Sequence, residues 1–174
     1  MAKNAGKNFE DSFKKSIPNY VFLQRLNDSP QAFKKSKSTR FTPRNPYDFM
    51  CFDTEARTLF CLELKSTSNK YMGFEDIDSN EDENKMIHKH QIKGLLKASS
   101  YPNVIAGFLF NFRLSDDELT YFMEINDFRK MCVAINKKSF NLIDAVLYGA
   151  QKIDGFKKIT RWYWNLDDFF KSYR

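Results

Sequence analysis

The segment Thr58–Lys65 is the feature that most restricts how this chain can fold. It is largely apolar, but near its end Glu63 and Lys65 alternate with leucines. Side chains alternate along a strand, so Glu63 and Lys65 share one face while Leu62 and Leu64 share the other. The run is typical of a central strand, where a carboxylate and an ammonium carry a desolvation cost that packing alone does not offset. The pair therefore predicts a functional site in the sheet.

Asp48 lies upstream, near the beginning of the preceding strand-like segment, and completes the candidate site. Asp48 and Glu63 are suitable ligands for a hard divalent cation. Lys65 is suited to orient an attacking water or to neutralise charge that develops on a phosphate. An acid-x-Lys tripeptide is common on surface strands, so two interpretations stay open: a metal-dependent phosphodiesterase site, or a structural ion pair at a strand end.

Two further polar residues are candidates for the same site. Gln91 lies four residues from an apolar residue in each direction, which places it on the apolar stripe of a helix. Its amide either ties down a loop or presents its oxygen to a metal or to a metal-bound water. Glu10 follows Phe9 on the first predicted helix, and is either a solvated acid or a group that leans toward the Asp48–Glu63 pair.

Hydrophobic periodicity predicts one α/β domain over residues 1–174, with a small mixed sheet flanked by helices and no repeats. Helices are expected over about 6–17, 85–98 and 128–135, the last capped by Asp127. Strands are expected over 20–23, 47–52, 58–65, 104–110 and 119–125. The strands 47–52 and 58–65 are expected to be antiparallel around a turn at 53–57. Short helices and an aromatic tail follow.

Two polar segments are predicted to be loops: a basic arm at 28–44 and a long acidic loop at 66–84. The acids between 75 and 83 are expected to be solvated. The arm has no acid from residue 34 onward, and its basic residues are Lys34, Lys35, Lys37, Arg40 and Arg44. Basic residues interleaved with Phe33 and Phe41, in a chain of net charge +6, favour DNA as the partner over a merely solvating loop.

Composition excludes several classes of protein. The 174 residues include 18 Phe and 8 Tyr, enough to build a core. No apolar stretch approaches the roughly 20 residues needed to cross a bilayer, and the first residues do not form a signal peptide. Three cysteines without paired spacing argue against disulfides and a zinc site, so a cytoplasmic location is expected.

His88 and His90 would face different sides of a helix, which favours phosphate contact or exposure over shared metal binding.

The order of these motifs resembles the RecU-type Holliday junction resolvases of the PD-(D/E)xK nuclease superfamily. The resemblance covers most of the chain. The matching segments are Gly6–Glu10, Tyr20–Pro30, Pro46–Asp48, Leu62–Lys70, His90–Ile92, Val104–Phe112, Tyr121–Met123 and Ile153–Gly155. The His-Gln pair at the start of a helix is the most specific of them. The chain departs from the family at Pro46, where a Thr is usual, in an arm shorter than the family's stalk, and in the apparent insertion at 75–83.

The resemblance implies a restriction-endonuclease-like fold, with a short basic stalk or arm, and a homodimeric endonuclease that cuts four-way DNA junctions. It implies that Mg²⁺ is the cofactor, with Mn²⁺ also supporting activity, and that Asp48, Glu63 and Gln91 are associated with the metal. Lys65 would stabilise the transition state. A compact variant of this kind is typical of a bacteriophage, which would place it in the cytoplasm of the bacterial host.

Two alternatives remain open at the level of the sequence. The first is another nuclease of the same superfamily that acts on duplex or other branched DNA. The second is a non-catalytic, basic DNA-binding protein in which Glu63 and Lys65 form a structural ion pair.

Overall fold

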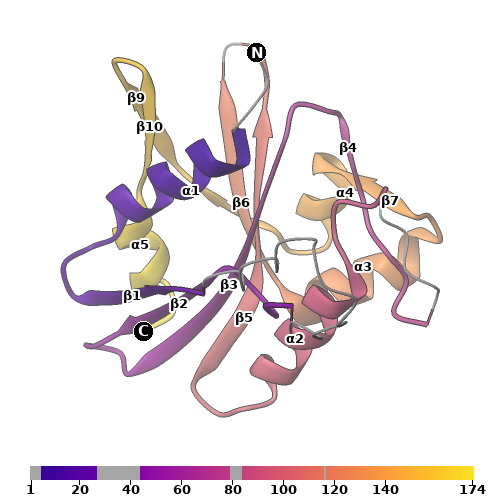
Figure 1. Ribbon diagram of the computed structural model, residues 1–174, viewed down its shortest axis with the longest axis horizontal. Helices are drawn as coiled ribbons and strands as arrows, with labels where there is room; N and C mark the ends of the chain where they lie inside the picture. The colour runs from indigo at the N-terminus through magenta and orange to yellow at the C-terminus, as the bar shows by residue number, and fades with distance from the viewer. Residues whose placement is uncertain (1–4, 27–43, 79–83, 116) are drawn as a thin grey trace, which may run out of the picture.

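A six-stranded mixed sheet forms the centre of the molecule (Figure 1). The computed structural model describes residues 5–26, 44–78, 84–115 and 117–174. The strand order is β1-β2-β3-β5-β6-β8. The strands are β1 (Val21–Arg25), β2 (Phe49–Asp53), β3 (Thr58–Thr67), β5 (Val104–Arg113), β6 (Glu118–Glu124) and β8 (Gln151–Ile153). β3 and β5 are parallel and all other neighbours are antiparallel.

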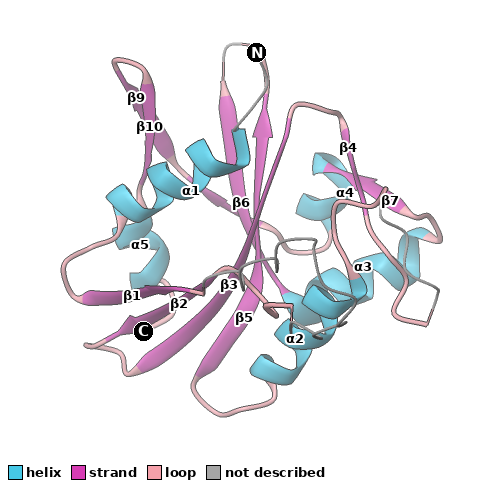
Figure 2. Cartoon of the chain, in the orientation of Figure 1, coloured by secondary structure: helices cyan, strands magenta, loops and turns pink. Residues whose placement is uncertain are grey.

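Helices cover both faces of this sheet, which confirms the predicted fold class (Figure 2). The helices are α1 (Ala5–Ser16), α2 (Lys89–Ser99), α3 (Ile125–Ile135), α4 (Leu142–Leu147) and α5 (Leu166–Lys171). α1 and α5 lie on one side of the sheet, and α2, α3 and α4 lie on the other (Figure 1). Two small antiparallel sheets complete the fold: β4 (Tyr71–Gly73) with β7 (Ser139–Asn141), and β9 (Gly155–Lys158) with β10 (Arg161–Trp164).

Strand alternation divides the core between the two faces. Leu62 on β3 packs with Phe13 of α1 and Phe170 of α5 in one cluster. Cys61, one residue earlier, packs in the other cluster with Phe128 of α3. These five side chains are at most 1% exposed, and full burial of a large apolar side chain contributes about 1.5–3 kcal/mol. The two apolar layers explain why β3 is nearly continuous in apolar residues.

Most predicted elements are confirmed, but two helix starts are wrong. β2 and β3 are antiparallel as expected, with Asp53 opposite Thr58 at the turn. The second helix begins at Lys89 and not near 85, because Ile87 instead donates its main-chain N–H to Gly73 and forms a bridge with Phe74. The third helix begins at Ile125 with Glu124 as its N-cap, so the predicted cap at Asp127 is also wrong.

The prediction of a single long loop over 66–84 is wrong in part. β3 continues to Thr67, and β4 then pairs with β7. Phe74 and Glu75 are buried, with 4% and 3% of their surfaces exposed. The predicted arm at 28–44 falls outside the described residues except for Arg44. In the described part of the chain, no helix combines the length and apolar character that crossing a membrane requires.

Candidate active site

Glu63 and Lys65 lie on the same face of β3, as the period of two residues in a strand requires. Only 3% of Glu63 is exposed. Its Oε1 atom is 2.9 Å from the Nζ atom of Lys65. Burial raises the pKa of Glu63 to about 7; the charge of Lys65 opposes this shift, and the charge of Asp48 adds to it. The site therefore contains a carboxyl group that needs more positive charge nearby to remain ionised near neutral pH.

Asp48 lies immediately before β2 and reaches the same place. Its main-chain N–H donates to the carbonyl of Leu62 (3.1 Å), and its Oδ2 atom accepts from the N–H of Leu64 (2.8 Å). These two bonds hold the Asp48 carboxylate against the part of β3 that carries Glu63. Burial raises the pKa of Asp48, while the Leu64 N–H and the charge of Lys65 lower it. The two carboxylates that the sequence singles out therefore converge.

Gln91 also reaches the site, but it is the amide nitrogen, and not the oxygen, that contacts Glu63. The Nε2 group donates to Glu63 Oε1, and the buried side chain connects α2 to β3. Its Oε1 atom accepts from the main-chain N–H of His88 (2.9 Å), as part of a capping box at the start of α2. In the structure this oxygen is used by the helix terminus, and the expectation that it contacts a metal stays a prediction.

Glu10 approaches the site from α1 and is held by a residue that the sequence did not single out. Its Oε2 atom accepts from Arg25 Nε at 2.9 Å. The charge of Glu10 raises the pKa of both Asp48 and Glu63, while the charge of Arg25 lowers the pKa of Asp48. Arg25 is opposite Phe49, the residue after Asp48, in the β1–β2 pairing. A basic residue at the end of β1 was the only sequence signal for this contact.

The start of α2 is tied to a buried acid that the sequence predicted to be solvated. Glu75 accepts from the N–H of Lys89 through Oε2 (2.6 Å), and its Oε1 lies 3.3 Å from His88 Nδ1. The prediction for Glu75 is therefore wrong: its carboxylate stabilises the N-terminus of the helix that carries Gln91. The rings of His88 and His90 are stacked, with centroids 5.7 Å apart. Both histidines are half-buried and not freely exposed.

The basic residues predicted to bind DNA are for the most part beyond what the structure describes. Lys34, Lys35, Lys37 and Arg40 fall outside the described residues, whereas Arg44 is described and exposed. Burial lowers the pKa of His90, and the charge of Arg44 acts in the same direction. Arg44 therefore lies on the side of the molecule where α2 begins.

Asp48 and Glu63 are carboxylates of the kind that hard divalent cations bind. Within the described ranges, no group of three or more His, Cys, Asp or Glu side chains is arranged to hold a metal ion. Mg²⁺ commonly uses one or two carboxylates and retains several waters. Asp48 and Glu63 supply two carboxylates, and the raised pKa values of both are what a bound cation would reverse.

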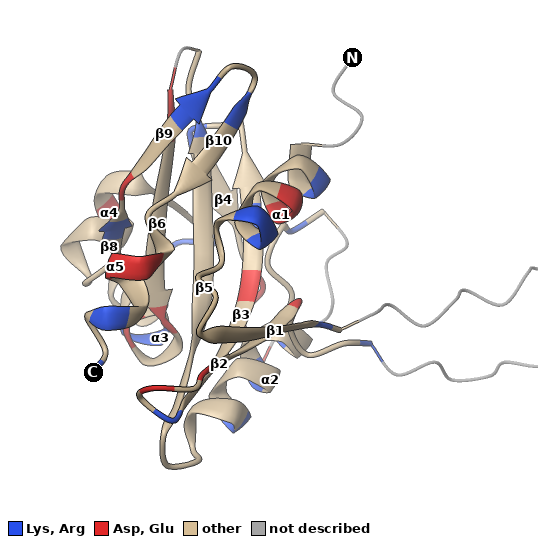
Figure 3. Ribbon diagram, turned by 90° about the vertical axis from the view of Figure 1, so that its left-hand side faces the viewer, with Lys and Arg blue, Asp and Glu red and all other residues tan. Residues whose placement is uncertain are grey.

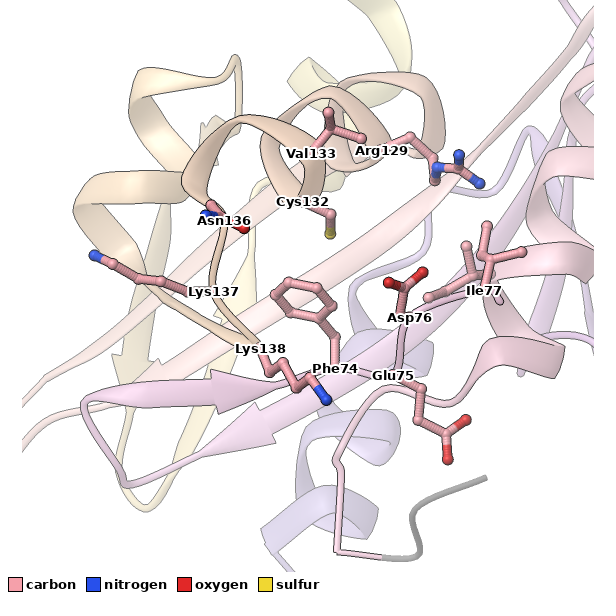
Figure 4. Close-up of a pocket in the computed structure, with 11 residues that line it drawn as sticks. Phe74, Glu75, Asp76, Ile77, Arg129, Cys132, Val133, Asn136, Lys137 and Lys138 are labelled. Atoms are coloured by element: carbon pink, nitrogen blue, oxygen red, sulfur yellow. The ribbon is translucent and has the colours of Figure 1, made fainter. Parts of the chain in front are cut away.

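A cavity of about 360 Å³ lies away from these residues, between the β4–α2 segment and α3 (Figure 4). The ring of Phe74 and the thiol of Cys132 face into it, whereas Glu75 points away toward α2. Asp76 and Arg129 bring opposite charges to its wall. None of the predicted site residues lines this cavity. We therefore do not assign the active site to it.

Comparison with known proteins finds a clear relative in sequence and a more remote likeness among solved structures. No model of a known protein family matches the chain. Over 128 residues it is 39% identical to the SPbeta prophage-derived uncharacterized protein YotM of Bacillus subtilis (strain 168); the alignment covers 73% of this chain and 59% of the relative, which is less than two thirds of the relative's length. Among solved structures it is similar to Hjc, a Holliday junction resolvase of Archaeoglobus fulgidus, with a TM-score of 0.44 and 11% identity over 84% of this chain and 91% of that one. At this level of likeness the function must be argued from the residues of the site.

Proposed function

We propose that the chain is a metal-dependent DNA endonuclease with Asp48, Glu63 and Lys65 as its catalytic residues. One observation carries this proposal: on β3 a carboxylate that is 3% exposed lies beside an ammonium, and a second carboxylate reaches it from the residue before β2. Burying such a group is unfavourable for folding when an apolar residue of similar size would serve. Perturbed carboxyl groups that converge in this way are typical of catalytic sites.

Magnesium is the cofactor that this donor set supports, and manganese is expected to substitute for it. Asp48 and Glu63 would hold the ion. When bound, the ion would supply a Lewis acid and lower the pKa of a coordinated water, the nucleophile for phosphodiester hydrolysis.

The other residues prepare and stabilise these groups. Lys65, which forms an ion pair with Glu63, would neutralise negative charge on the phosphate in the transition state. Gln91 donates to Glu63 from α2 and so orients this carboxylate. Glu10, held by Arg25, adds negative charge at the same place and would help to retain a metal-bound water.

For the substrate we propose branched DNA, and specifically the four-way junction, cut by a homodimer. A net charge of +6 and the concentration of basic residues in the arm support a phosphate polymer as partner. A two-fold symmetric dimer would place two sites at symmetric strands of a junction. The prophage relative supports a phage-encoded protein that acts in the cytoplasm of a bacterial host.

Cleavage of a labelled four-way junction, with and without Mg²⁺ or Mn²⁺, tests the proposal. The Glu63→Gln variant keeps the shape of the side chain, so we expect it to bind the junction with unchanged affinity but to cut it at least about 100-fold more slowly. Glu55→Gln, at an exposed acid on the β2–β3 turn, is the matched control and should cut normally.

Three results would count against the proposal. Normal cutting by Glu63→Gln removes the site assignment. Equal cutting of the junction and of a duplex with the same arms identifies a nuclease that does not select branched DNA. Tight, salt-sensitive binding without cutting of any DNA identifies a non-catalytic DNA-binding protein.

A further inference from the structure

The β9–β10 hairpin projects from the body of the molecule beside α1 (Figure 1). Its base is firmly attached. Trp164 is 4% exposed, its ring meets that of Phe9 edge to face at 5.9 Å, and its main-chain N–H donates to Ser16 Oγ at 3.0 Å. A Cβ atom at Gly155, opposite Trp164 in the pairing, would lie 2.4 Å from the indole, so only glycine permits this packing. The hairpin is therefore held in a fixed direction relative to α1.

The tip of the hairpin places an apolar side chain in solvent at a strained position. Lys158 pairs with Arg161, so the turn consists of Ile159 and Thr160. Ile159 has a φ of 58° and is 90% exposed. Hairpin turns normally place Gly, Asn or Asp at a position with positive φ, and a β-branched residue there is a rare exception. Neither local backbone preference nor burial explains an isoleucine at this site.

On the outer face of the hairpin, two positively charged residues face each other across the strand pair. Lys158 and Arg161 are directly opposite one another, and like charges in this arrangement destabilise a sheet. Neither forms an ion pair with any residue that the structure describes. On the same face, the rings of Phe156 and Tyr163 are stacked with centroids 5.8 Å apart, and Phe156 is 59% exposed.

We propose that this hairpin is a DNA-binding element in which Ile159 inserts next to unstacked bases while Lys158 and Arg161 bind the flanking phosphates. The inference rests on the proposed nuclease function and extends it to a surface outside the arm. Apolar side chains wedge between base steps in many DNA-distorting proteins. An anion between Lys158 and Arg161 removes their mutual repulsion, and exposed rings stack on splayed bases. A purely apolar partner would leave that repulsion uncompensated.

The position of the hairpin suits this role. It packs against α1, the helix that also carries Glu10 at the candidate site. In Figure 3 the basic residues of β9 and β10 stand at one end of the molecule, with α1 beside them and β3 beyond. DNA bound by the hairpin and cut at Glu63 would therefore run along α1. The strain at the tip is retained because a bent or open DNA substrate is recognised there.

Binding measurements in the Glu63→Gln background of the whole 174-residue chain, without divalent metal, test the hairpin separately from catalysis. The probe is a four-way junction with 2-aminopurine at the branch point. We expect Lys158→Ala/Arg161→Ala to weaken binding at least tenfold and to reduce the slope of log K against log salt by about 0.9 for each phosphate that is no longer bound. Lys137→Ala/Lys138→Ala, at two exposed lysines after α3, is the charge-matched control and should have a much smaller effect.

Ile159→Asn tests the wedge. Asparagine tolerates positive φ, so the variant should be at least as stable as the parent. It should lose most of the fluorescence increase of 2-aminopurine on binding, with its salt slope unchanged. Ile143→Asn, at a 76% exposed isoleucine on α4, should retain that increase.

The two proposals fail in different ways. Hairpin variants that bind the junction and raise the fluorescence as the parent does overturn the hairpin proposal, whatever the result of the cleavage assay. Variants that lose dimerisation in sedimentation but bind DNA normally assign the hairpin to an interface between two copies of the chain and overturn it too. Absence of cleavage in the parent, with weakened binding in the hairpin variants, would refute the nuclease and leave the hairpin proposal standing.

Discussion

The protonation of Glu63 gives a direct prediction for the metal-free protein. Burial raises its pKa from 4.5 to about 7. Between these values the folded protein holds a proton that the unfolded chain has already released, so the free energy of unfolding falls as the pH rises. At about 1.4 kcal/mol per pH unit, the loss between pH 4.5 and 7 is about 3 kcal/mol. The contribution of the protonated carboxyl group to the free energy of unfolding is fully present below pH 4.5 and is lost as the pH rises through 7.

Comparison with Glu63→Gln isolates this effect, because the amide does not titrate. Urea unfolding of both proteins in EDTA, from pH 4.5 to 8, gives the difference in their free energies of unfolding. We expect this difference to change by about 3 kcal/mol in favour of the variant as the pH rises. Titrating groups that do not interact with Glu63 are the same in both proteins and cancel. At pH 8, Mg²⁺ should stabilise the parent and not the variant, because the ion binds the ionised carboxylate.

A difference that stays constant with pH would refute the reasoning. It would mean that Glu63 is ionised in the folded protein throughout this range, and that its ion pair with Lys65 outweighs desolvation. A difference that moves in favour of the parent at high pH would have the same meaning. Glu55→Gln, at an acid whose side chain is 56% exposed, is the control for replacing a carboxylate by an amide away from the site.

Two predictions concern the framework of the site. Gly107→Ala places a Cβ atom 2.3 Å from the carbonyl oxygen of Met123, between β5 and β6, and should lower the free energy of unfolding by about 1–3 kcal/mol. Gly6→Ala is the control: there is open space around Gly6 in α1, so this substitution should not lower the free energy of unfolding. Equal effects of the two substitutions on chemical denaturation would show that the sheet adjusts to the added methyl group. Glu75→Ala should lower the free energy of unfolding by about 1–2 kcal/mol and increase hydrogen exchange at the start of α2. Asp78→Ala, at an exposed acid nearby, should change neither quantity. Unchanged hydrogen exchange in Glu75→Ala would contradict the role of Glu75 as a cap.

The parts of the fold that the sequence predicted depend on interactions close together along the chain. The apolar run of β3 and the turn before it predicted the antiparallel pair with β2, which the structure confirms. The period of two in a strand places Glu63 and Lys65 on one face whatever packs around that strand. The upstream acid at Asp48 then had to lie close to them, because antiparallel pairing brings the start of β2 to the end of β3.

The wrong predictions for β4 and for the start of α2 fall where long-range contacts decide the structure. Tyr71–Gly73 looks like part of a polar loop, but it becomes β4 because β7, far along the chain, supplies its hydrogen-bond partners. The predicted start of α2 is too early, because Ile87 fits a helical period and yet is held in a bridge to Phe74. Local propensity is a weak guide when a buried strand can form instead.

The same division applies to the candidate site. The sequence alone determined which carboxylate and which lysine share a strand face, because alternation is a property of any strand. Only the tertiary structure decided that Arg25 holds Glu10, that Glu75 is a buried helix cap, and that Gln91 turns its nitrogen to Glu63. These arrangements depend on hydrogen bonds between elements far apart in the chain, and each polar atom takes the partner that packing brings within reach.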